Sequence, residues 1–319
     1  MSNATLRRPA APPSPERRSR RRPPRRIEVQ FRTIISPHQL NSRWGRRVYW
    51  AVLVATVVTF TVVFLLPMYW MITGALKSAE EFAQVPPTLF PKELNFGKFL
   101  ESWELFDIGT LLKNTVLYAA GGWLITMSVD VAAAYALSKL RPAFGNVILG
   151  AMLATLMIPP MVVLIPTYLA IHDVPILGWD LLNNPWGLWL PAAANGFNIF
   201  LLKRFFDSIP RELLEAAQID GGGPFRILWS VVLPVSRPIL GVTSIFTIVT
   251  SFKDFIWPLL VMSDSEKMTL SVGLAQTAGA VSQDQVMGGL VIASIPTVIV
   301  FFIFQRHIMA GLTAGSLKG

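Results

Sequence analysis

The sequence predicts an all-α polytopic membrane protein with six transmembrane helices. Hydrophobic residues make up 52% of its 319 residues and charged residues only 15%, whereas about a quarter of the residues in a soluble domain are charged. Apolar stretches near the ~20 residues that a helix needs to cross a bilayer occur at six places: 48–72, 111–137, 147–171, 186–202, 239–262 and 287–308. Together they predict a six-helix transmembrane domain over residues 48–309.

The charges between these stretches divide by sign, which predicts the orientation of the chain. Basic residues follow the even-numbered stretches: Lys139, Arg141, Lys203, Arg204, Arg211, Arg226, Arg306 and Lys318. Acidic residues dominate the other connections: Glu80, Glu81, Glu93, Glu101, Glu104, Asp107, Asp173, Asp180, Asp264, Glu266 and Asp284. Because positive charge marks cytoplasmic loops, both termini are expected on the cytoplasmic side.

Residues 1–47 form a basic, Arg-Pro-rich N-terminal tail that carries most of the excess positive charge of the chain, which is +9 overall. This composition cannot bury apolar surface, so a disordered cytoplasmic tail is expected. The simplest role is to hold the N-terminus in the cytoplasm and near anionic membrane lipid. Arginine runs also suggest nucleic-acid binding, but the adjoining membrane span makes that interpretation secondary, and no nucleic-acid partner is expected.

A polar segment between the fourth and fifth stretches carries the most specific pattern in the chain. It reads E-A-A-x-x-D-G, then nine residues, then V-x-L-P, and its defining residues are Glu215, Ala216, Ala217, Asp220, Gly221, Leu233 and Pro234. Small residues let a short helix lie close to a partner. Gly221 suits the left-handed end of that helix, and Pro234 with Pro238 suits the first turn of the next.

This pattern resembles the EAA loop of the membrane subunits of bacterial ATP-binding-cassette (ABC) importers, with Val231 where that family usually has Ile. The resemblance implies the transmembrane domain of a type I ABC importer in the bacterial plasma (inner) membrane. It implies that the loop at about 207–234 holds a coupling helix that docks on the cytoplasmic ATPase. The alternative from the residues alone is an ordinary amphipathic loop helix.

Three further stretches are similar to permeases of carbohydrate importers. The chain ends in Q-R-H-I-M-A-G-L-T-A-G-S-L-K-G, the fifth stretch holds F-K-D-F-I-W-P-L-L, and Ala134-Tyr135-Ala136-Leu137 ends the second. Pro159, Pro160 and Pro166 match the proline-marked third span of the family. The resemblance therefore favours a sugar or oligosaccharide as solute. Residues 310–319 are expected to be a non-helical cytoplasmic tail that contacts the ATPase through Gly311, Leu312, Thr313, Gly315 and Lys318.

Two charged neighbours, Lys253 and Asp254, fall near the middle of the fifth stretch. A charge at that depth is costly unless it is paired or hydrated, and neighbours on a helix do not face each other. Lys253, Asp254 and nearby Trp257 are therefore candidates for the translocation path. An ion pair within or between permease subunits, or a lysine that reaches the interface from a tilted helix, explains the charges equally well. Asp130 in the second stretch is better explained by a buried hydrogen bond.

No residues for bond-making chemistry are evident, so the chain is not expected to be an enzyme. It lacks cysteine, a Walker-type G-x-x-x-x-G-K-[ST] cradle and metal-ligand histidine spacing. No cofactor is therefore expected in this chain: ATP and Mg²⁺ would bind to partner ATPase subunits. The resemblance implies as partners a second permease subunit, two ATP-binding-cassette subunits and an extracytoplasmic sugar-binding protein. Alternatives are an importer of another solute, such as a polyamine or phosphate, and an ion-coupled secondary transporter.

Overall fold

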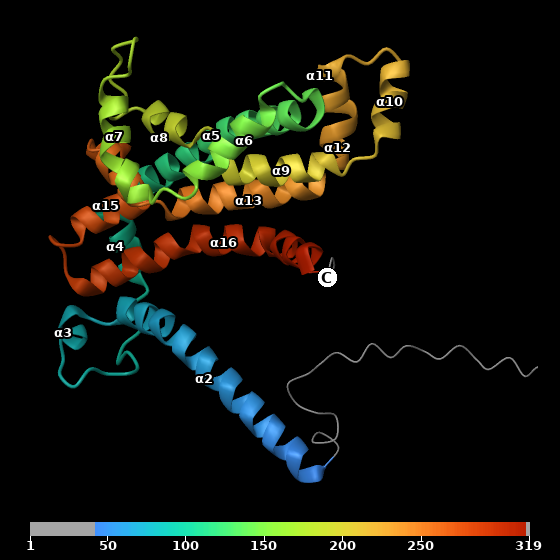
Figure 1. Cartoon of the computed structure of the whole chain (residues 1–319). Coiled ribbons are helices and arrows are strands. Elements are labelled where there is room, and N and C mark those ends of the chain that lie inside the picture. Colours follow the sequence, from blue (N-terminus) through green and yellow to red (C-terminus); the bar gives the residue numbers. More distant parts are fainter. Residues whose placement is uncertain (1–41, 317–319) are drawn as a thin grey trace, which may run out of the picture. The chain divides into compact units, whose positions relative to one another are not determined.

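A computed structural model describes residues 42–316, and within them it contains helices, turns and loops but no β-strand (Figure 1). The chain divides into two units, residues 1–62 and 63–319. The first helix of the described residues, α2 (Arg43–Leu76), crosses this division. It begins before residue 47, so the last residues of the predicted basic tail are helical, whereas residues 1–41 lie outside the described part.

The described helices after α2 are α3 (Ala79–Phe82), α4 (Gly97–Leu105), α5 (Ile108–Tyr135), α6 (Gly145–Thr155), α7 (Pro160–His172), α8 (Pro185–Ala192), α9 (Gly196–Asp207), α10 (Arg211–Ile219), α11 (Pro224–Ile227), α12 (Leu233–Val235), α13 (Arg237–Lys253), α14 (Ile256–Val261), α15 (Leu270–Thr277) and α16 (Gln283–Ser316). Two π-helical turns, η1 (Ala136–Leu140) and η2 (Leu228–Val232), and one 3₁₀ turn, η3 (Ser265–Lys267), complete the described elements.

Three described helices are long and apolar enough to cross a membrane by themselves: α2, the continuous α5–η1 helix, and Gln283–Ile303 of α16. Two pairs pass the same test together but are bent, α6 with α7 by 106° and Pro224–Val235 with α13 by 83°, which gives up to five spans. All six predicted stretches are helical, but the third, fourth and fifth are each divided into two helices. The chain is thus an all-α, multi-pass membrane protein.

The three interruptions fall where the sequence disfavours a continuous helix. In the third stretch, Pro160 occupies the first turn of α7, where its missing N–H costs nothing. In the fourth, residues 193–195 separate α8 from α9, and the Asn195 side chain caps the new helix. In the fifth, α13 ends at Lys253 and Asp254 takes an extended conformation before α14 begins. Hydropathy averaged over a window does not detect such breaks.

Helix α5 is the element around which the second unit packs, with α9 and α13 along its length (Figure 1). One core cluster joins the C-terminal part of α5 to α9 and to the segment after α10. Its buried members are Ala134, Tyr135, Leu137, Ile199, Leu202, Phe206, Ile209, Ile227, Leu228 and Val232. This cluster therefore connects the predicted coupling loop to two membrane helices.

Residues 77–107 fold onto the first turn of α16 through a buried ion pair. Lys98 of α4 pairs with Asp284 of α16, and its Nζ also donates to the carbonyl oxygen of Lys77 at 2.6 Å. Nearby, the Ser102 hydroxyl donates to the carbonyl of Gln285 at 3.2 Å. A buried charge is tolerated when it is paired and hydrogen-bonded in this way. The segment is therefore a packed part of the unit.

The end of the chain differs from the prediction. Helix α16 continues to Ser316, so the expectation of a non-helical tail from residue 310 is wrong for the described residues 310–316. The run contains no proline, and its two alanines and its leucine favour helix, although it also has two glycines. Residues 317–319, including Lys318, lie outside the described part of the chain.

Candidate functional site

The segment with the E-A-A-x-x-D-G pattern forms α10, and its end has the hydrogen bonds of a Schellman motif. Gly221 has φ +78° and donates its N–H to the carbonyl of Gln218 at 3.0 Å, while Gly222 donates to the carbonyl of Ala217 at 2.9 Å. Asp220 is the last residue before this turn. The left-handed conformation at Gly221 confirms the helix end expected from the sequence, and it explains the need for glycine there.

One side of α10 packs on the core cluster shared with α5 and α9. Leu214 and Ala217 lie against that cluster, as does Leu233 of α12. The Tyr135 hydroxyl of α5 donates to the carbonyl of Pro224 at 2.9 Å, which ties the turn after α10 to the same membrane helix. These contacts join α10 and the turn after it directly to α5 and α9.

The other side of α10 is exposed and carries the remaining predicted coupling residues. Glu215, Ala216 and Asp220 are exposed there, and Pro234 is exposed in α12. The predicted coupling residues thus occupy three kinds of position. Ala217 and Leu233 anchor the loop, Gly221 shapes the helix end, and the others face outward.

Large apolar side chains next to these residues are also exposed, and sequence reasoning did not single them out. Ile219 is 86% exposed, Phe225 81% and Trp229 71%. Exposed apolar residues in contiguous groups mark interaction sites. The available signal was the presence of two aromatic residues in a loop expected outside the membrane.

Electrostatics fix the end of α9 just before this loop. Asp207 accepts from Lys203 Nζ at 2.7 Å and from the Ser138 hydroxyl at 2.7 Å. Burial by itself would raise the pKa of the Asp207 carboxyl, but these hydrogen bonds and the positive charges of Lys203 and Lys139 lower that pKa below its ordinary value. The carboxylate form is therefore favoured by its surroundings.

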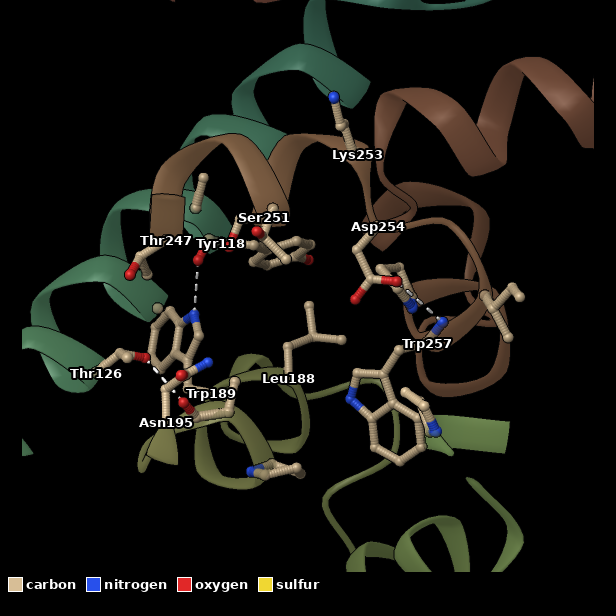
Figure 2. Close-up of a pocket in the computed structure, with 18 of the residues that line it drawn as sticks. Tyr118, Thr126, Leu188, Trp189, Asn195, Thr247, Ser251, Lys253, Asp254 and Trp257 are labelled. Atoms are coloured by element: carbon tan, nitrogen blue, oxygen red, sulfur yellow. Dashed lines mark hydrogen bonds between the residues drawn. The ribbon is translucent and has the colours of Figure 1, made fainter. Parts of the chain in front are cut away.

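A cavity of about 970 Å³ lies at the other end of α9, among α5, α7, α8 and the α13–α14 break. Its wall combines aromatic rings with hydroxyl and amide side chains, including Thr126, Trp189, Asn195, Asn198, Thr247, Ser251, Asp254 and Trp257 (Figure 2). Residues at all three interruptions contribute to this wall. Irregular backbone at membrane depth is tolerated where it lines a cavity, so the breaks and the cavity form one feature.

The predicted translocation residues are only partly brought together. Figure 2 shows Asp254 pointing into the cavity toward Leu188 and Trp257, whereas Lys253 points the opposite way. Asp254 accepts from the backbone N–H of Trp257 at 3.4 Å. Among the described residues, neither Lys253 nor Asp254 has an ion-pair partner. Lys253, Asp254 and Trp257 all border the cavity, but the side chain of Lys253 points away from the other two.

Two tryptophans hold α8 in place at the cavity wall. Trp189 Nε1 donates to the carbonyl of Tyr118 at 3.0 Å, and Trp257 Nε1 donates to the carbonyl of Gly187 at 3.2 Å. Only glycine fits at position 187, because an added Cβ would stand 2.4 Å from the carbonyl oxygen of Leu181. The two tryptophan hydrogen bonds join residues about 70 positions apart, so they could not be predicted from the sequence.

The remaining predicted contacts lie in the last part of the chain. Gly311, Leu312, Thr313 and Gly315 belong to the backbone of α16, and Lys318 is outside the described residues. No group of three metal-ligating side chains occurs in the searched part of the chain, residues 42–316.

Comparison with known proteins agrees with this architecture. A model of the family "binding-protein-dependent transport system inner membrane component" matches residues 130–313. The probable ABC transporter permease YurM of Bacillus subtilis is 31% identical over 79% of this chain and 83% of its own. The sn-glycerol-3-phosphate permease UgpE of Yersinia pestis is 31% identical, with 78% and 90% covered. The diacetylchitobiose permease NgcG of Streptomyces coelicolor is 28% identical, with 83% and 87% covered.

A solved structure has the same fold. A crystal structure of a bacterial ABC transporter involved in import of the acidic polysaccharide alginate matches with a TM-score of 0.73 and 27% identity, over 83% of this chain and 98% of that one. The named relatives are permease components and not enzymes. This chain therefore belongs to the family of binding-protein-dependent transport system inner membrane components, as a permease of the carbohydrate type of ABC importer.

Proposed function

We propose that this chain is the transmembrane permease subunit of an ATP-driven, binding-protein-dependent importer for a sugar or oligosaccharide. Relatives named for diacetylchitobiose and for melibiose, raffinose and stachyose support this solute class. So does the cavity wall, where hydroxyl, amide and indole groups suit a polyhydroxylated solute. A relative named for sn-glycerol 3-phosphate makes that solute the second one to test.

The observation that carries the proposal is that α10 packs on the core with one side and is exposed on the other. Its inner residues Leu214 and Ala217 lie on the cluster formed by α5 and α9, while Glu215 and Ile219 face outward. A helix that is anchored inside and exposed outside suits an element that receives a partner and passes on its motion. The expected partner surface is a dimer of two ATP-binding-cassette subunits, which bind ATP and Mg²⁺ themselves.

In the proposed cycle, ATP closes the ATPase dimer and displaces α10 with it. The membrane helices then change from inward-facing to outward-facing, and solute enters from an external binding protein. ATP acts as a ligand with different affinity for the two states, and this chain supplies the element that changes state. A second permease subunit completes the path, in which Asp254 and Trp257 would contact the solute.

This mechanism requires α10 and both termini to lie in the cytoplasm. The basic residues Lys139, Lys203, Arg211 and Arg226 support that orientation through the positive-inside rule. The bacterial plasma membrane is the proposed location. The end of α16, from Gly311 onward, would then emerge beside the ATPase and touch it.

The direct test is to reconstitute the full complex with its binding protein and to measure the ATPase rate with each candidate solute. The proposal predicts that a sugar or oligosaccharide raises the rate and is taken up. Stimulation by glycerol 3-phosphate alone would assign the complex to a phosphorylated polyol instead. Uptake that persists without the ATPase subunits would indicate a secondary transporter. Truncation after Ala310 should leave the complex assembled but weaken the stimulation.

A further inference from the structure

The interruption between α8 and α9 leaves backbone groups of the membrane domain without helical partners. The first N–H groups of a helix have no acceptor inside it. The Asn195 side chain supplies one, since its Oδ1 accepts from the backbone N–H groups of Phe197 and Asn198, both at 3.1 Å. This cap fixes the start of α9, but it does not by itself attach α9 to the rest of the protein.

Asp130 makes that attachment from α5. Its side chain is fully buried, with a relative exposure of 0%. One carboxylate oxygen accepts from the backbone N–H of Asn195 at 2.9 Å, and the other accepts from Asn198 Nδ2 at 3.1 Å. Burial of a carboxylate is costly unless such bonds compensate for lost water. The Asp130 carboxylate is therefore tolerated because both of its oxygens accept hydrogen bonds from residues at the break between α8 and α9.

Asn198 extends the attachment to a third helix. Its Nδ2 also donates to the Thr247 hydroxyl of α13 at 3.2 Å. Asn195, Asn198 and Thr247 also line the cavity wall, and Asp130 lies behind them. One buried carboxylate and one buried amide thus hold α5, α9 and α13 together where the fourth membrane stretch is interrupted.

The opposite end of α9 is attached to α5 as well. There the Ser138 hydroxyl donates to Asp207 at 2.7 Å. Between the two attachments, Ile199, Leu202 and Phe206 are fully buried on the core cluster. Helix α9 therefore contacts the continuous α5–η1 helix at its beginning, along its middle and at its end. The chain continues from that end to α10.

From this geometry we propose that Asp130 and Asn198 are positioning residues, which make α5 and α9 move as one rigid pair and carry the displacement of α10 to the helix break at the cavity. The inference rests on the proposed function, because it specifies how coupling motion reaches the solute path. Loosening the Asp130–Asn198 contact should leave ATP hydrolysis running while solute movement no longer follows it.

Exchanging the carboxylate of Asp130 and the amide of Asn198 tests the contact between them. Asn198→Asp places two carboxylates face to face and should lower solute uptake per ATP at least tenfold. Asp130→Asn combined with Asn198→Asp restores one amide and one carboxylate, and should return uptake per ATP to within about twofold of wild type. The control is Asn184→Asp, the same change at the residue that caps α8. It should leave uptake per ATP unchanged.

The melting temperature of the purified complex tests the Asp130–Asn198 contact in a measurement that does not depend on transport. It should fall with Asn198→Asp and recover in the double variant. Absence of sugar transport by the wild-type complex contradicts the proposed function, whatever the melting temperatures show. If the wild-type complex transports sugar, two results would overturn the inference. One is normal uptake per ATP in Asn198→Asp, and the other is uptake per ATP in the double variant no higher than in Asn198→Asp.

A covalent link gives a second test if Asn198→Asp does not fold. The chain has no cysteine, so Ser138→Cys with Asp207→Cys can be joined by a short bifunctional thiol reagent. Linking should raise uptake per ATP above that of the unlinked double variant, because the pair moves as one body. A link that stops transport would show that α5 and α9 must separate during the cycle, which would overturn the inference.

Discussion

The indole ring of Trp189 lies so close to Gly121 that a Cβ at position 121 would stand 2.3 Å from Cζ2 of the ring. The Nε1–H of Trp189 is fixed on the carbonyl of Tyr118 at 3.0 Å. The ring therefore cannot move aside without losing that hydrogen bond. This contact packs α8 against α5 at the wall of the cavity.

Gly121→Ala is expected to destabilise the protein by about 1–3 kcal/mol, the usual cost of overpacking a core. Gly150→Ala is the matched control, because nothing lies within 4 Å of an added Cβ there. Alanine should stabilise that helix by up to ~1 kcal/mol. Melting temperatures in detergent test both changes, and equal values for the two variants would contradict the close contact.

The end of α10 depends on the backbone conformation of Gly221 more than on space. An added Cβ at Gly221 or at Gly223 meets nothing within 4 Å, but only Gly221 has positive φ. Gly221→Ala should therefore cost about 1–2 kcal/mol at the helix end and reduce uptake, whereas Gly223→Ala should leave it near wild type. Uptake normalised to inserted protein distinguishes them. Normal uptake in both variants would remove Gly221 from the coupling element.

Features that depend on the conformational preference of a single residue could be predicted from the sequence. The helix end at Gly221 follows from the preference of glycine for the left-handed conformation. The start of α7 at Pro160 was not predicted, although proline suits the first turn of a helix. The exposed position of Glu215 and the inward position of Ala217 could not be assigned in this way, since they depend on which side of α10 meets the core.

Contacts between residues that are far apart in the chain could not be predicted from the sequence. A single chain gives no sign that Asp130 faces Asn198, or that Trp189 lies on Gly121. The helix break at 193–195 had a local signal, the Asn195-Gly196 dipeptide typical of turns, but the apolar stretch around it concealed that signal. The fold class therefore followed from composition and motif, whereas the cavity required the structure.

Asp254 and Lys253 should differ in their effect on transport. Both border the cavity, but the Asp254 side chain points toward Leu188 and Trp257, and the Lys253 side chain points the opposite way. A hydrogen bond to a charged group contributes about 1.5–3 kcal/mol, so Asp254→Ala should raise the KM for uptake roughly tenfold or more. Lys253→Asn should leave KM near wild type. Initial uptake rates at varied solute concentration check this. Equal rises in KM for both variants would show that Lys253 also reaches the path.

Acid stability should depend on Asp207. Its lowered folded-state pKa means that the carboxylate contributes stability above the unfolded pKa of about 3.9 and that this contribution is lost as pH falls through the folded pKa. The melting temperature of wild type should therefore fall more between pH 6 and pH 3 than that of Asp207→Asn. Parallel decreases in the two proteins would indicate that the Lys203 and Ser138 contacts do not stabilise the carboxylate form.

Site-specific cross-linking can show whether α10 docks on the ATPase. Because the chain lacks cysteine, Ile219→Cys and Ile176→Cys each create one reactive site, at positions 86% and 105% exposed. After labelling with a photoreactive maleimide, position 219 should cross-link to an ATP-binding-cassette subunit, with a yield that changes when ATP is added. Position 176, between α7 and α8, should give no such product. Cross-linking from 176, or none from 219 in a complex that transports, would contradict the account.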